Sequence, residues 1–594
     1  MSTSAADRPS VEYGSDLVIE LLTSFGVEHF AFNPGASFRG IHDSLVQFDR
    51  PHPVLCNQEM IAVAVAHGYA KAANKPMAVG LHNIVGLQQA SMAIFNAWCD
   101  RAPIMILGGT GPLSVPARRP WIDWIHTAQV QGEQVRHYVK WDDQPFDIAS
   151  IPESFVRAWT AMTADPPGPV YLCYDVSLQE AELPNAPAVP RPGAVPTPRD
   201  PAPDCIALRA VAERLRSARL PVIITDFAGA TPSGFDLLVQ LAEATGAPVV
   251  DRGARHSFPS THPLNFSVLP EVIADADVIV AIDVDDLFGA LLGNAVDQFD
   301  DTVVRRNGQW IAHITPQHYK LRSWASDAQR QVPVDELISG SALPTMTALI
   351  AEFDERPVEP AALIERSSVT DGRVATAREA WRREALREDI DDCVGVARLA
   401  FEVGEALDSS RLDWALANGT LQGWERRLWS MDRPRQRFGN AGGGGGGLGY
   451  GMGASIGVSL ALGSETMVVN LQSDGDFMFT PSALWTIVAE QLPILTVLHN
   501  NRQYGNTVNH ALKMAESRGR SSDRVGVGTS LDDPRIDYAA MAASMGMWAK
   551  GPITSVDELK SALRYALDEI RAGRPALIDI ITPGVETGLA TGLM

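Results

Sequence analysis

The sequence predicts an α/β fold made of three doubly wound parallel-sheet domains. Its 594 residues exceed what a single hydrophobic core usually serves. Short apolar runs typical of buried strands alternate with helical stretches along most of the chain, which implies parallel strands joined by crossover helices. Two stretches of different composition, one rich in proline and one rich in Arg and Glu, divide this alternation into three blocks of similar size.

These composition shifts set the expected domain boundaries. We expect an N-terminal domain over residues 1–183, a linker over 184–204 that holds eight prolines, a central α/β domain over 205–350, a second linker over 351–392 and a C-terminal domain over 393–594. The second linker contains a helical piece around residues 375–388. We see no short-period repeat.

The elements follow from apolar periodicity and from β-branched content. In the first block we expect helices at Gly14–Phe25 and Met60–Ala73, and strands at Val27–Phe32, Pro53–Leu55, Met77–Leu81, Pro103–Leu107 and Val170–Tyr174. In the second block we expect strands at Pro221–Thr225, Pro248–Asp251, Val278–Ile282 and Trp310–Ile314. The clearest strands of the third block are Met467–Leu471 and Leu495–His499, and Met452–Leu462 reads as a buried helix.

The overall composition excludes some classes of function. A formal charge of −22 argues against non-specific binding to nucleic acid or to anionic membranes. Five scattered cysteines without a CxxC pair fit reduced thiols. No stretch reads as a secretion signal or as a membrane span of about 20 apolar residues. We therefore expect a cytoplasmic protein that acts on a small molecule.

Polar residues follow two of the strands in the third block. Asp474, Gly475 and Asp476 come directly after the first strand, and Asn501 follows the second. The carboxyl ends of parallel strands meet at one edge of a sheet, where ligands bind. The two clusters should therefore lie close together, although each cluster alone is also typical of an ordinary turn after a strand.

The residue types in these clusters suit Mg²⁺, which prefers oxygen ligands and is usually held together with a phosphate. Asp474 would supply a carboxylate, Asn501 a side-chain carbonyl and Gln503 a backbone carbonyl. Gly475 would let the backbone approach a phosphate.

This segment resembles the Gly-Asp-Gly and Asn-Asn motif of thiamine-diphosphate-dependent enzymes, with Ser473 in place of the first glycine. The resemblance is to the group that contains acetolactate synthase, benzoylformate decarboxylase and 2-hydroxyacyl-CoA lyase. It covers nearly the whole chain and implies, in order, a pyrimidine-binding domain, a central domain and a diphosphate-binding domain. It also implies thiamine diphosphate and Mg²⁺ as cofactors.

The family needs a buried carboxyl beside the cofactor's pyrimidine ring, because burial raises the pKa of such a carboxyl and lets it share a proton with the ring. Glu59 stands in the setting that the family uses, directly before a helix rich in small residues. The alternative interpretation is a glutamate favoured by the helix dipole. Asn33 and Pro34 resemble the family's first strand-turn and are expected at the cofactor.

The glycine-rich stretch Gly442–Gly451 resembles the family's loop under the cofactor. Leu448 falls where a large apolar side chain wedges between the two rings, and the carbonyl of Gly446 would face the exocyclic amine. A flexible linker is the alternative, but the buried helix that follows argues against it. We also expect Asp476 and Tyr504 at the cofactor.

Two stretches point to different branches of the family. Leu81–Trp98 resembles benzoylformate decarboxylase, which makes His82 the leading proton-transfer residue, although that relative carries serine where this chain has Ala36. Trp121–Thr127 resembles the acetolactate synthase and 2-hydroxyacyl-CoA lyase branch, which makes His126 a catalytic candidate and Thr127 a substrate contact. Asn506 and His510 are tentative substrate contacts on the opposite wall.

Each histidine also has a purely structural interpretation, and for His256 and His262 we favour it. None has the spacing of a zinc site. The resemblance leaves FAD or an ADP moiety possible in the central domain. The turn Asp226–Thr231 follows a strand there, but no GxGxxG pattern supports a nucleotide.

The expected function is a lyase, decarboxylase or carboligase that acts on a small 2-oxoacid. One alternative is a 2-hydroxyacyl-CoA lyase, and another is a non-catalytic paralogue that binds the cofactor. The resemblance implies a homodimer or homotetramer with active sites between subunits, so that Glu59 of one chain would face Asp474 and Asn501 of another.

Overall fold

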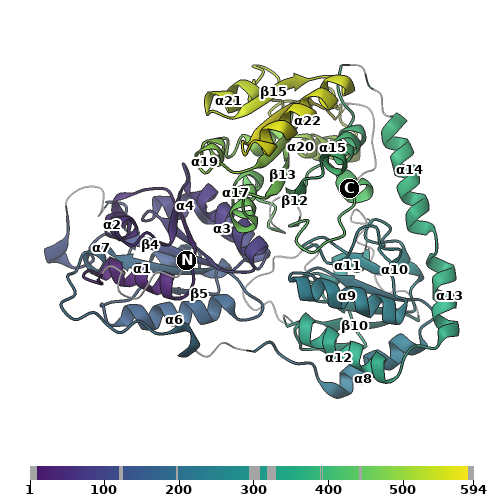
Figure 1. Cartoon of the computed structure of the whole chain (residues 1–594), viewed down its shortest axis with the longest axis horizontal. Coiled ribbons are helices and arrows are strands. Elements are labelled where there is room, and N and C mark those ends of the chain that lie inside the picture. Colours follow the sequence, from purple (N-terminus) through teal and green to yellow (C-terminus); the bar gives the residue numbers. More distant parts are fainter. Residues whose placement is uncertain are drawn as a thin grey trace.

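The computed structural model describes residues 10–119, 125–194, 199–292, 308–316, 330–387, 390, 392–439 and 444–585. Within them the chain forms one six-stranded and two five-stranded sheets, and the strands of each sheet are parallel (Figure 1). Helices cover both faces of each sheet. The predicted three-sheet α/β fold is confirmed. None of the described helices has the length and apolar character needed to cross a membrane.

The N-terminal sheet has the strand order β2-β1-β3-β4-β6-β5. Its strands are β1 (His29–Phe32), β2 (His52–Leu55), β3 (Met77–Leu81), β4 (Ile104–Thr110), β5 (Trp141–Asp143) and β6 (Val170–Asp175). Helices α1 (Gly14–Ser24), α2 (Arg39–Phe48) and α6 (Ser150–Thr163) cover one face, while α3 (Glu59–Ala73) and α4 (Val85–Cys99) cover the other. The short helix α7 (Val176–Gln179) follows β6.

The central sheet has the strand order β11-β10-β9-β7-β8. Its strands are β7 (Pro221–Thr225), β8 (Val249–Asp251), β9 (Val278–Ile282), β10 (Trp310–Ile314) and β11 (Glu336–Ile338). Helices α8 (Cys205–Ser217), α9 (Pro232–Thr245) and α12 (Ala342–Glu355) cover one face, and α10 (Val272–Asp275) and α11 (Leu287–Leu292) cover the other. Most of the segment expected as a second linker is helical, as α13 (Pro360–Thr370) and α14 (Arg373–Arg387), which run along the outside toward the third sheet (Figure 1).

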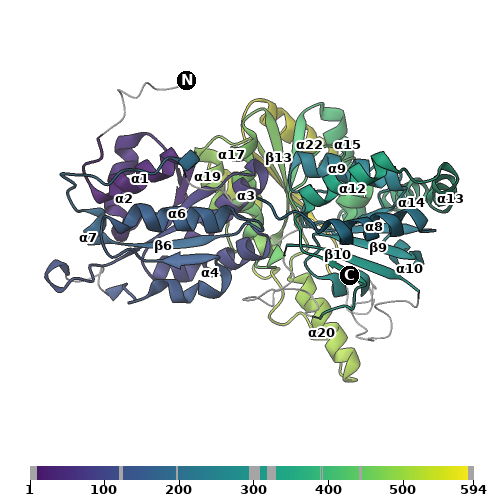
Figure 2. The same cartoon turned by 90° about the horizontal axis from the view of Figure 1, so that it is seen from below.

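The C-terminal sheet has the strand order β12-β13-β14-β16-β15. Its strands are β12 (Asp413–Asn418), β13 (Thr466–Ser473), β14 (Ile494–Asn500), β15 (Trp548–Ile553) and β16 (Ala576–Ile581). Helices α15 (Val396–Ser410), α16 (Trp424–Leu428) and α22 (Val556–Arg571) cover one face, and α17 (Tyr450–Leu462), α19 (Ala483–Ala489) and α21 (Tyr538–Ser544) cover the other. The short α18 (Asp474–Phe477) follows β13, and α20 (Gly505–Ser517) projects from the body (Figure 2).

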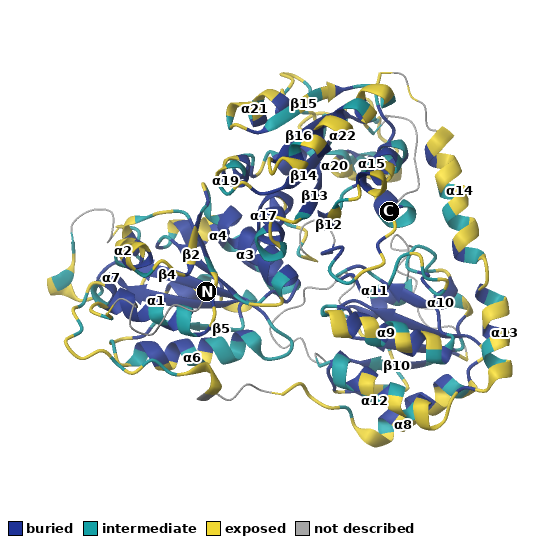
Figure 3. Cartoon of the chain, viewed as in Figure 1, coloured by how far each residue is buried: buried dark blue, intermediate teal, exposed yellow. Residues whose placement is uncertain are grey.

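One hydrophobic core is shared by the N-terminal and C-terminal sheets, and the close contact of α3 with α17 lies at its centre (Figures 1 and 3). The contact depends on glycines. A Cβ on Gly457 would lie 1.9 Å from the carbonyl oxygen of Val65, and one on Gly68 would lie 2.1 Å from that of Ala454. Both backbones therefore touch directly, which fixes the two helices along their length.

The two helices also run in the same direction, so their first turns lie at the same end of the contact. A Cβ on Gly449, just before α17, would lie 2.9 Å from the Met60 side chain in the first turn of α3. Further along, Gly453 faces Ala64 and Gly457 faces Val65. Any residue placed at the start of α3 is thereby held next to the segment that leads into α17.

We predict that Gly457→Ala destabilises the protein, although alanine is the better helix former by about 1 kcal/mol. The added methyl group must displace the Val65 backbone, and overpacking of this kind costs about 1–3 kcal/mol. Thermal unfolding should show a lower midpoint than for the wild type. Gly526→Ala is the control, because a Cβ added there would have no atom within 4 Å. Equal midpoints for the two variants would refute the tight contact.

Candidate active site

The two predicted polar clusters lie side by side at the carboxyl edge of the C-terminal sheet. β13 and β14 are neighbours, and Ser473 pairs in register with His499. Ser473 has an ordinary extended backbone (φ −89°, ψ 150°), so serine is tolerated in the place of the family's glycine. The ring of Tyr504 packs on Gly475, where a Cβ would lie 2.7 Å from it. This contact joins the segments that follow the two strands.

Asp474 is a buried carboxyl without a partner. Its exposed fraction is 1%, and neither carboxylate oxygen has a hydrogen bond within the described part of the chain. Burial raises its pKa from the ordinary 3.8 to about 6, and the nearby backbone N–H groups, with that of Gly475 first and that of Arg502 next, only partly offset that rise. A buried carboxylate is costly unless it is paired or binds a metal. The donor set therefore fits a divalent cation.

The other predicted metal ligands are adjacent. The side-chain oxygen of Asn501 accepts a hydrogen bond from the backbone N–H of Gln503 at 3.1 Å. The carbonyl of Gln503 accepts one from Gly505 at 3.0 Å, and a carbonyl oxygen keeps a second lone pair for a cation. Hence Asp474, Asn501 and Gln503 are brought together, as the sequence predicts.

Asp476, which we expected at the cofactor, is already satisfied by protein groups. One carboxylate oxygen accepts the backbone N–H of Gly449 at 2.6 Å, and the other accepts the side-chain amide of Gln472. Asp476 thus connects the segment after β13 to Gly449, the residue that follows Leu448.

The glycine loop is described from Gly444 onward, and Gly442 and Gly443 lie outside the described residues. Gly446 has a left-handed backbone (φ 69°) and Leu448 is 39% exposed. Asn96 of α4 holds this loop by two reciprocal bonds, because its amide donates to the carbonyl of Gly447 and accepts the Gly447 N–H, both at 3.1 Å. Sequence reasoning missed Asn96, although a buried polar residue in an apolar helix was a usable signal.

Glu59 is the first residue of α3 and is half-buried. A Cβ on Gly86 would lie 2.8 Å from a Glu59 carboxylate oxygen and 3.1 Å from the Cβ of His82. Gly86 therefore leaves the room in which the predicted carboxyl and the predicted histidine lie near each other.

His82 lies at the centre of a small polar group. The turn that contains Asn33 and Pro34 packs on it, since a Cβ on Gly35 would lie 2.7 Å from the His82 ring. The hydroxyl of Ser37 lies 2.9 Å from its Nδ1, and Nδ1 of His126 lies 3.3 Å from its Nε2. Both predicted histidines are thus in contact.

Sequence reasoning missed Ser37 because it compared the relative's serine with Ala36, one residue earlier. The 3₁₀ turn η1 (Ala36–Phe38) leaves Ala36 exposed and turns Ser37 fully inward. A pattern of residue types cannot show which residue of such a turn faces the site.

The segment that carries His126 is braced from the strand ends. The hydroxyl of Thr127 accepts the backbone N–H of Gly111, just after β4, at 2.9 Å. The amide of Gln131 accepts the N–H of Ile84 and donates to the carbonyl of Gly109, both at 2.6 Å. The first part of the predicted substrate segment, Trp121–Trp124, lies outside the described residues.

The tentative substrate residues Asn506 and His510 are exposed on α20. None of the interactions found among the described residues joins either of them to His82 or Glu59. His256 is buried against Phe235, and burial lowers its pKa to about 3, while His262 lies 3.4 Å from Glu243. The last two lie in the central domain, in structural surroundings.

The turn Asp226–Thr231, considered for FAD or ADP, is packed by protein groups. Arg101 from the N-terminal domain lies over the Phe227 ring and pairs with Asp283 and Asp285. A Cβ on Gly229 would lie 2.2 Å from Ser257. These contacts give a nucleotide no support at this turn.

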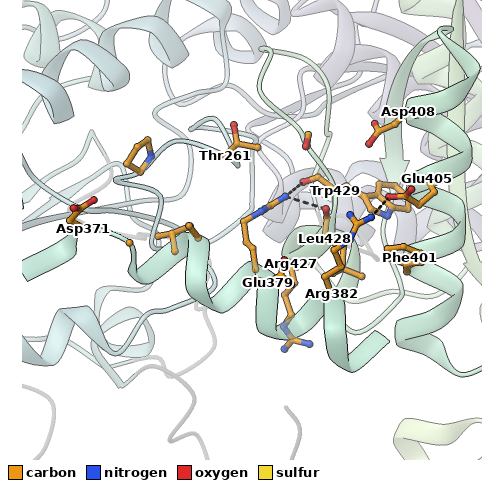
Figure 4. Close-up of a pocket in the computed structure, with 17 residues that line it drawn as sticks. Thr261, Asp371, Glu379, Arg382, Phe401, Glu405, Asp408, Arg427, Leu428 and Trp429 are labelled. Carbon is orange, nitrogen blue, oxygen red and sulfur yellow. Dashed lines mark hydrogen bonds and ion pairs between the residues drawn. The ribbon is translucent and has the colours of Figure 1, made fainter. Parts of the chain in front are cut away.

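A separate cavity of about 480 Å³ lies between α14, α15, α16 and the loop at Thr261 (Figure 4). Two of its arginines are engaged by protein groups, because Arg378 donates to the carbonyls of Leu428 and Trp429, and Arg382 pairs with Glu405 at 3.1 Å. None of the predicted site residues lines this cavity.

Comparison with known families agrees with this arrangement. Residues 13–129 match the N-terminal TPP binding domain of thiamine pyrophosphate enzymes, and residues 417–580 match the C-terminal TPP binding domain. The matches include Glu59 and His82 in the first region and Asp474 and Asn501 in the second.

The chain belongs to the thiamine-diphosphate-dependent enzymes. It is 26% identical to benzoylformate decarboxylase of Pseudomonas aeruginosa, over 90% of this chain and 92% of that protein. It is 24% identical to a probable chloroplastic acetolactate synthase 2 of Oryza sativa subsp. japonica, over 96% of this chain and 83% of that protein. Like these relatives, the chain is an enzyme of the decarboxylase and carboligase type.

Solved structures of thiamine-diphosphate enzymes share the fold. The 4-hydroxybenzoylformate decarboxylase of Rhodococcus jostii RHA1 superposes with a TM-score of 0.77 at 21% identity, covering 96% of this chain and 99% of that one. Benzoylformate decarboxylase of Polynucleobacter necessarius gives 0.74 at 19% identity, covering 96% and 99%.

We predict that Asp474→Asn stabilises the cofactor-free protein at pH 8. Since folding raises the pKa of Asp474 from 3.8 to about 6, ionisation costs stability, by up to about 3 kcal/mol above pH 6 and by nothing below about pH 4. Thermal unfolding at pH 8 and pH 4 should show the gain only at pH 8.

The same variant should lose the stabilisation that added thiamine diphosphate and Mg²⁺ give to the wild type. Asp175→Asn is the matched control, because that buried carboxylate of the N-terminal domain accepts the backbone N–H groups of Ser177 and Leu113 and its loss should destabilise the protein. An Asp474→Asn protein that is less stable at pH 8 than the wild type would contradict the unpaired carboxylate.

Proposed function

We propose that this enzyme uses thiamine diphosphate and Mg²⁺ to cleave the bond between the carboxylate and the carbonyl carbon of a small 2-oxoacid. The observation that carries the proposal is the grouping of Glu59, His82 and His126 around Gly35 and Gly86. This group puts a carboxyl and two imidazoles, the side chains suited to proton transfer, within one small region.

Asp474, Asn501 and Gln503 would hold Mg²⁺, and with it the diphosphate. The unpartnered oxygens of Asp474 support this assignment, because a bound cation supplies the charge that the protein does not. Tyr504 keeps the two ligand-bearing segments in contact by packing on Gly475.

Thiamine diphosphate supplies the carbanion that attacks the substrate carbonyl, and the protein supplies position and protons. Glu59 would exchange a proton with the pyrimidine ring nitrogen. Leu448, which is 39% exposed, offers the apolar surface on which the two rings of the cofactor would rest, and Asn96 and Asp476 hold the loop on either side of it. The contacting pair of His82 and His126 would provide the hydrogen-bond donor for the carbonyl oxygen of the substrate.

A 2-oxoacid substrate is supported by the relatives. Benzoylformate decarboxylase aligns over nearly the full chain, and a probable 2-ketoarginine decarboxylase of Pseudomonas aeruginosa is 28% identical over 45% of this chain. Carboligation is the second candidate reaction, favoured by the acetolactate synthases that align over 96–99% of the chain. Separate assays of CO₂, aldehyde and ligated product distinguish the two.

We further propose that the active site is completed between two chains of a homodimer or homotetramer. The half-exposed Leu448 and the half-buried Glu59 leave apolar and acidic surface that a second subunit would cover. On this proposal Glu59 of one chain works with Asp474 and Asn501 of the other.

We predict that Glu59→Gln abolishes turnover of 2-oxoacids while cofactor-induced thermal stabilisation persists, because the amide keeps the shape of the carboxyl but does not take up the ring proton. Rates of CO₂ release with saturating thiamine diphosphate and Mg²⁺ measure the effect. Undiminished turnover would refute the role of Glu59 and would favour the interpretation as a helix-start residue.

Co-expression of Glu59→Gln with Asp474→Asn tests the shared site. If each site combines Glu59 and Asp474 from different chains, half of the mixed dimers' sites are intact, so the mixture recovers about a quarter of wild-type activity. If both residues act within one chain, the mixture stays inactive. The two variants expressed separately are the controls.

A further inference from the structure

We propose that Ser37, His82 and His126 form a directional hydrogen-bond chain that makes His126 a neutral N–H donor to the carbonyl oxygen of the substrate. In this chain His126 is the catalytic residue, and Ser37 and His82 are positioning residues that act through it. The proposal rests on the proposed function. The sequence makes both histidines catalytic candidates, and this proposal gives the substrate contact to His126 and a positioning role to His82.

The hydroxyl of Ser37 sets the direction of the chain. Its oxygen accepts the backbone N–H of Asn83 at 3.0 Å, and a backbone N–H can only donate. Ser37 is fully buried, and the only acceptor that the described residues offer to its hydroxyl hydrogen is Nδ1 of His82, at 2.9 Å. If Nδ1 carried a proton instead, that hydroxyl hydrogen would be buried without an acceptor. His82 is therefore held with its proton on Nε2.

The donor-to-acceptor order of the hydrogen bonds continues from His82 to His126. Nε2 of His82 lies 3.3 Å from Nδ1 of His126, and the rings meet edge to face at 73°. A protonated Nε2 of His82 donates to Nδ1 of His126, which leaves the proton of a neutral His126 on its own Nε2. His126 is half-buried, and its Nε2 has no hydrogen-bond partner within the described residues, so this N–H is available to a ligand.

The neighbouring residues leave room for this hydrogen-bond chain and hold Ser37 in place. Gly109 of β4 makes room for Ser37, since a Cβ there would lie 2.6 Å from the Ser37 hydroxyl oxygen, and Gly35 makes room for the His82 ring. The amide of Gln179 donates to the carbonyl of Ser37 at 2.9 Å and fixes its backbone. The serine is thus held in place from both sides.

The addition step requires no proton from His126, while the proton that replaces CO₂ on the reacting carbon is taken up in a later step. When the substrate carbonyl is attacked, negative charge develops on its oxygen, and a neutral imidazole N–H stabilises that charge without first having to be protonated. A fixed tautomer keeps the N–H on the ring nitrogen that faces the substrate in every molecule. An imidazole without this hydrogen-bond chain would carry its proton on that nitrogen in only a fraction of the protein molecules.

The test is ¹⁵N-histidine solid-state NMR of the full-length protein, with His82 and His126 assigned by their single variants. We expect an unprotonated Nδ1 and a protonated Nε2 on both rings in the wild type. Ser37→Ala should give His82 a mixture of tautomers, while Ser37→Cys, which keeps a weak donor, should retain the wild-type form. Ser154→Ala is the matched control, because Ser154 is a buried serine of the same domain that donates to Asp143.

Kinetics give the second measurement. His126→Leu should lower kcat on the order of 10²-fold, the usual effect of removing one such donor, with a smaller change in KM. Ser37→Ala should lower kcat by less, and the exposed His137→Gln should have no effect. A proton on Nδ1 of His82 in the wild type, or a Ser37→Ala spectrum equal to that of the wild type, would overturn the proposal.

The two measurements separate this inference from the proposed function. If no 2-oxoacid is turned over by the wild type, the proposed function fails, and the NMR still decides whether the tautomer chain exists. If turnover is present and His126→Leu retains full kcat, the proposed function stands and the role of His126 is refuted.

Discussion

The direct backbone contact of α3 with α17 is the constraint on which the rest of the site depends. Gly68 and Gly457 let the two helices touch, and the helices run in the same direction. As a result Glu59, at the start of α3, and the loop that carries Leu448, at the start of α17, are fixed by one rigid core rather than by mobile loops. Within each chain this contact fixes the half-site that carries Glu59 relative to the half-site that carries Leu448 and Asp474, and in the proposed oligomer each half-site meets its complement on the partner chain.

Two buried carboxylates, Asp100 and Asp474, differ in whether the protein supplies positively charged partners for them. Burial would raise the pKa of Asp100, but Arg255 and Lys71 outweigh it and hold that pKa well below its ordinary value. Asp474 is equally buried and has no such partner, so its pKa rises to about 6. The protein thus neutralises the carboxylate that joins its domains and leaves unpaired the one that we assign to a cation.

Much of this was predictable from the sequence, for identifiable reasons. Strands such as Met77–Leu81 and Val278–Ile282 were placed to the residue, because central parallel strands are continuous apolar runs. The three-residue edge strands β5 (Trp-Asp-Asp) and β11 (Glu-Leu-Ile) were missed because acidic residues interrupt their short runs, whereas the equally short β8 was found through its apolar pair Val249 and Val250. Clusters at strand ends were found because they are local in sequence, whereas Ser37 and Asn96 depend on which way a turn or helix faces.

The most direct test of the account is a crystal structure of the enzyme with thiamine diphosphate and Mn²⁺ in place of Mg²⁺, using anomalous scattering to locate the metal. We expect the metal at Asp474 and the side-chain oxygen of Asn501, with Glu59 within hydrogen-bond distance of the pyrimidine ring. A metal bound elsewhere while both oxygens of Asp474 remain without a partner would contradict the assignment of the active site.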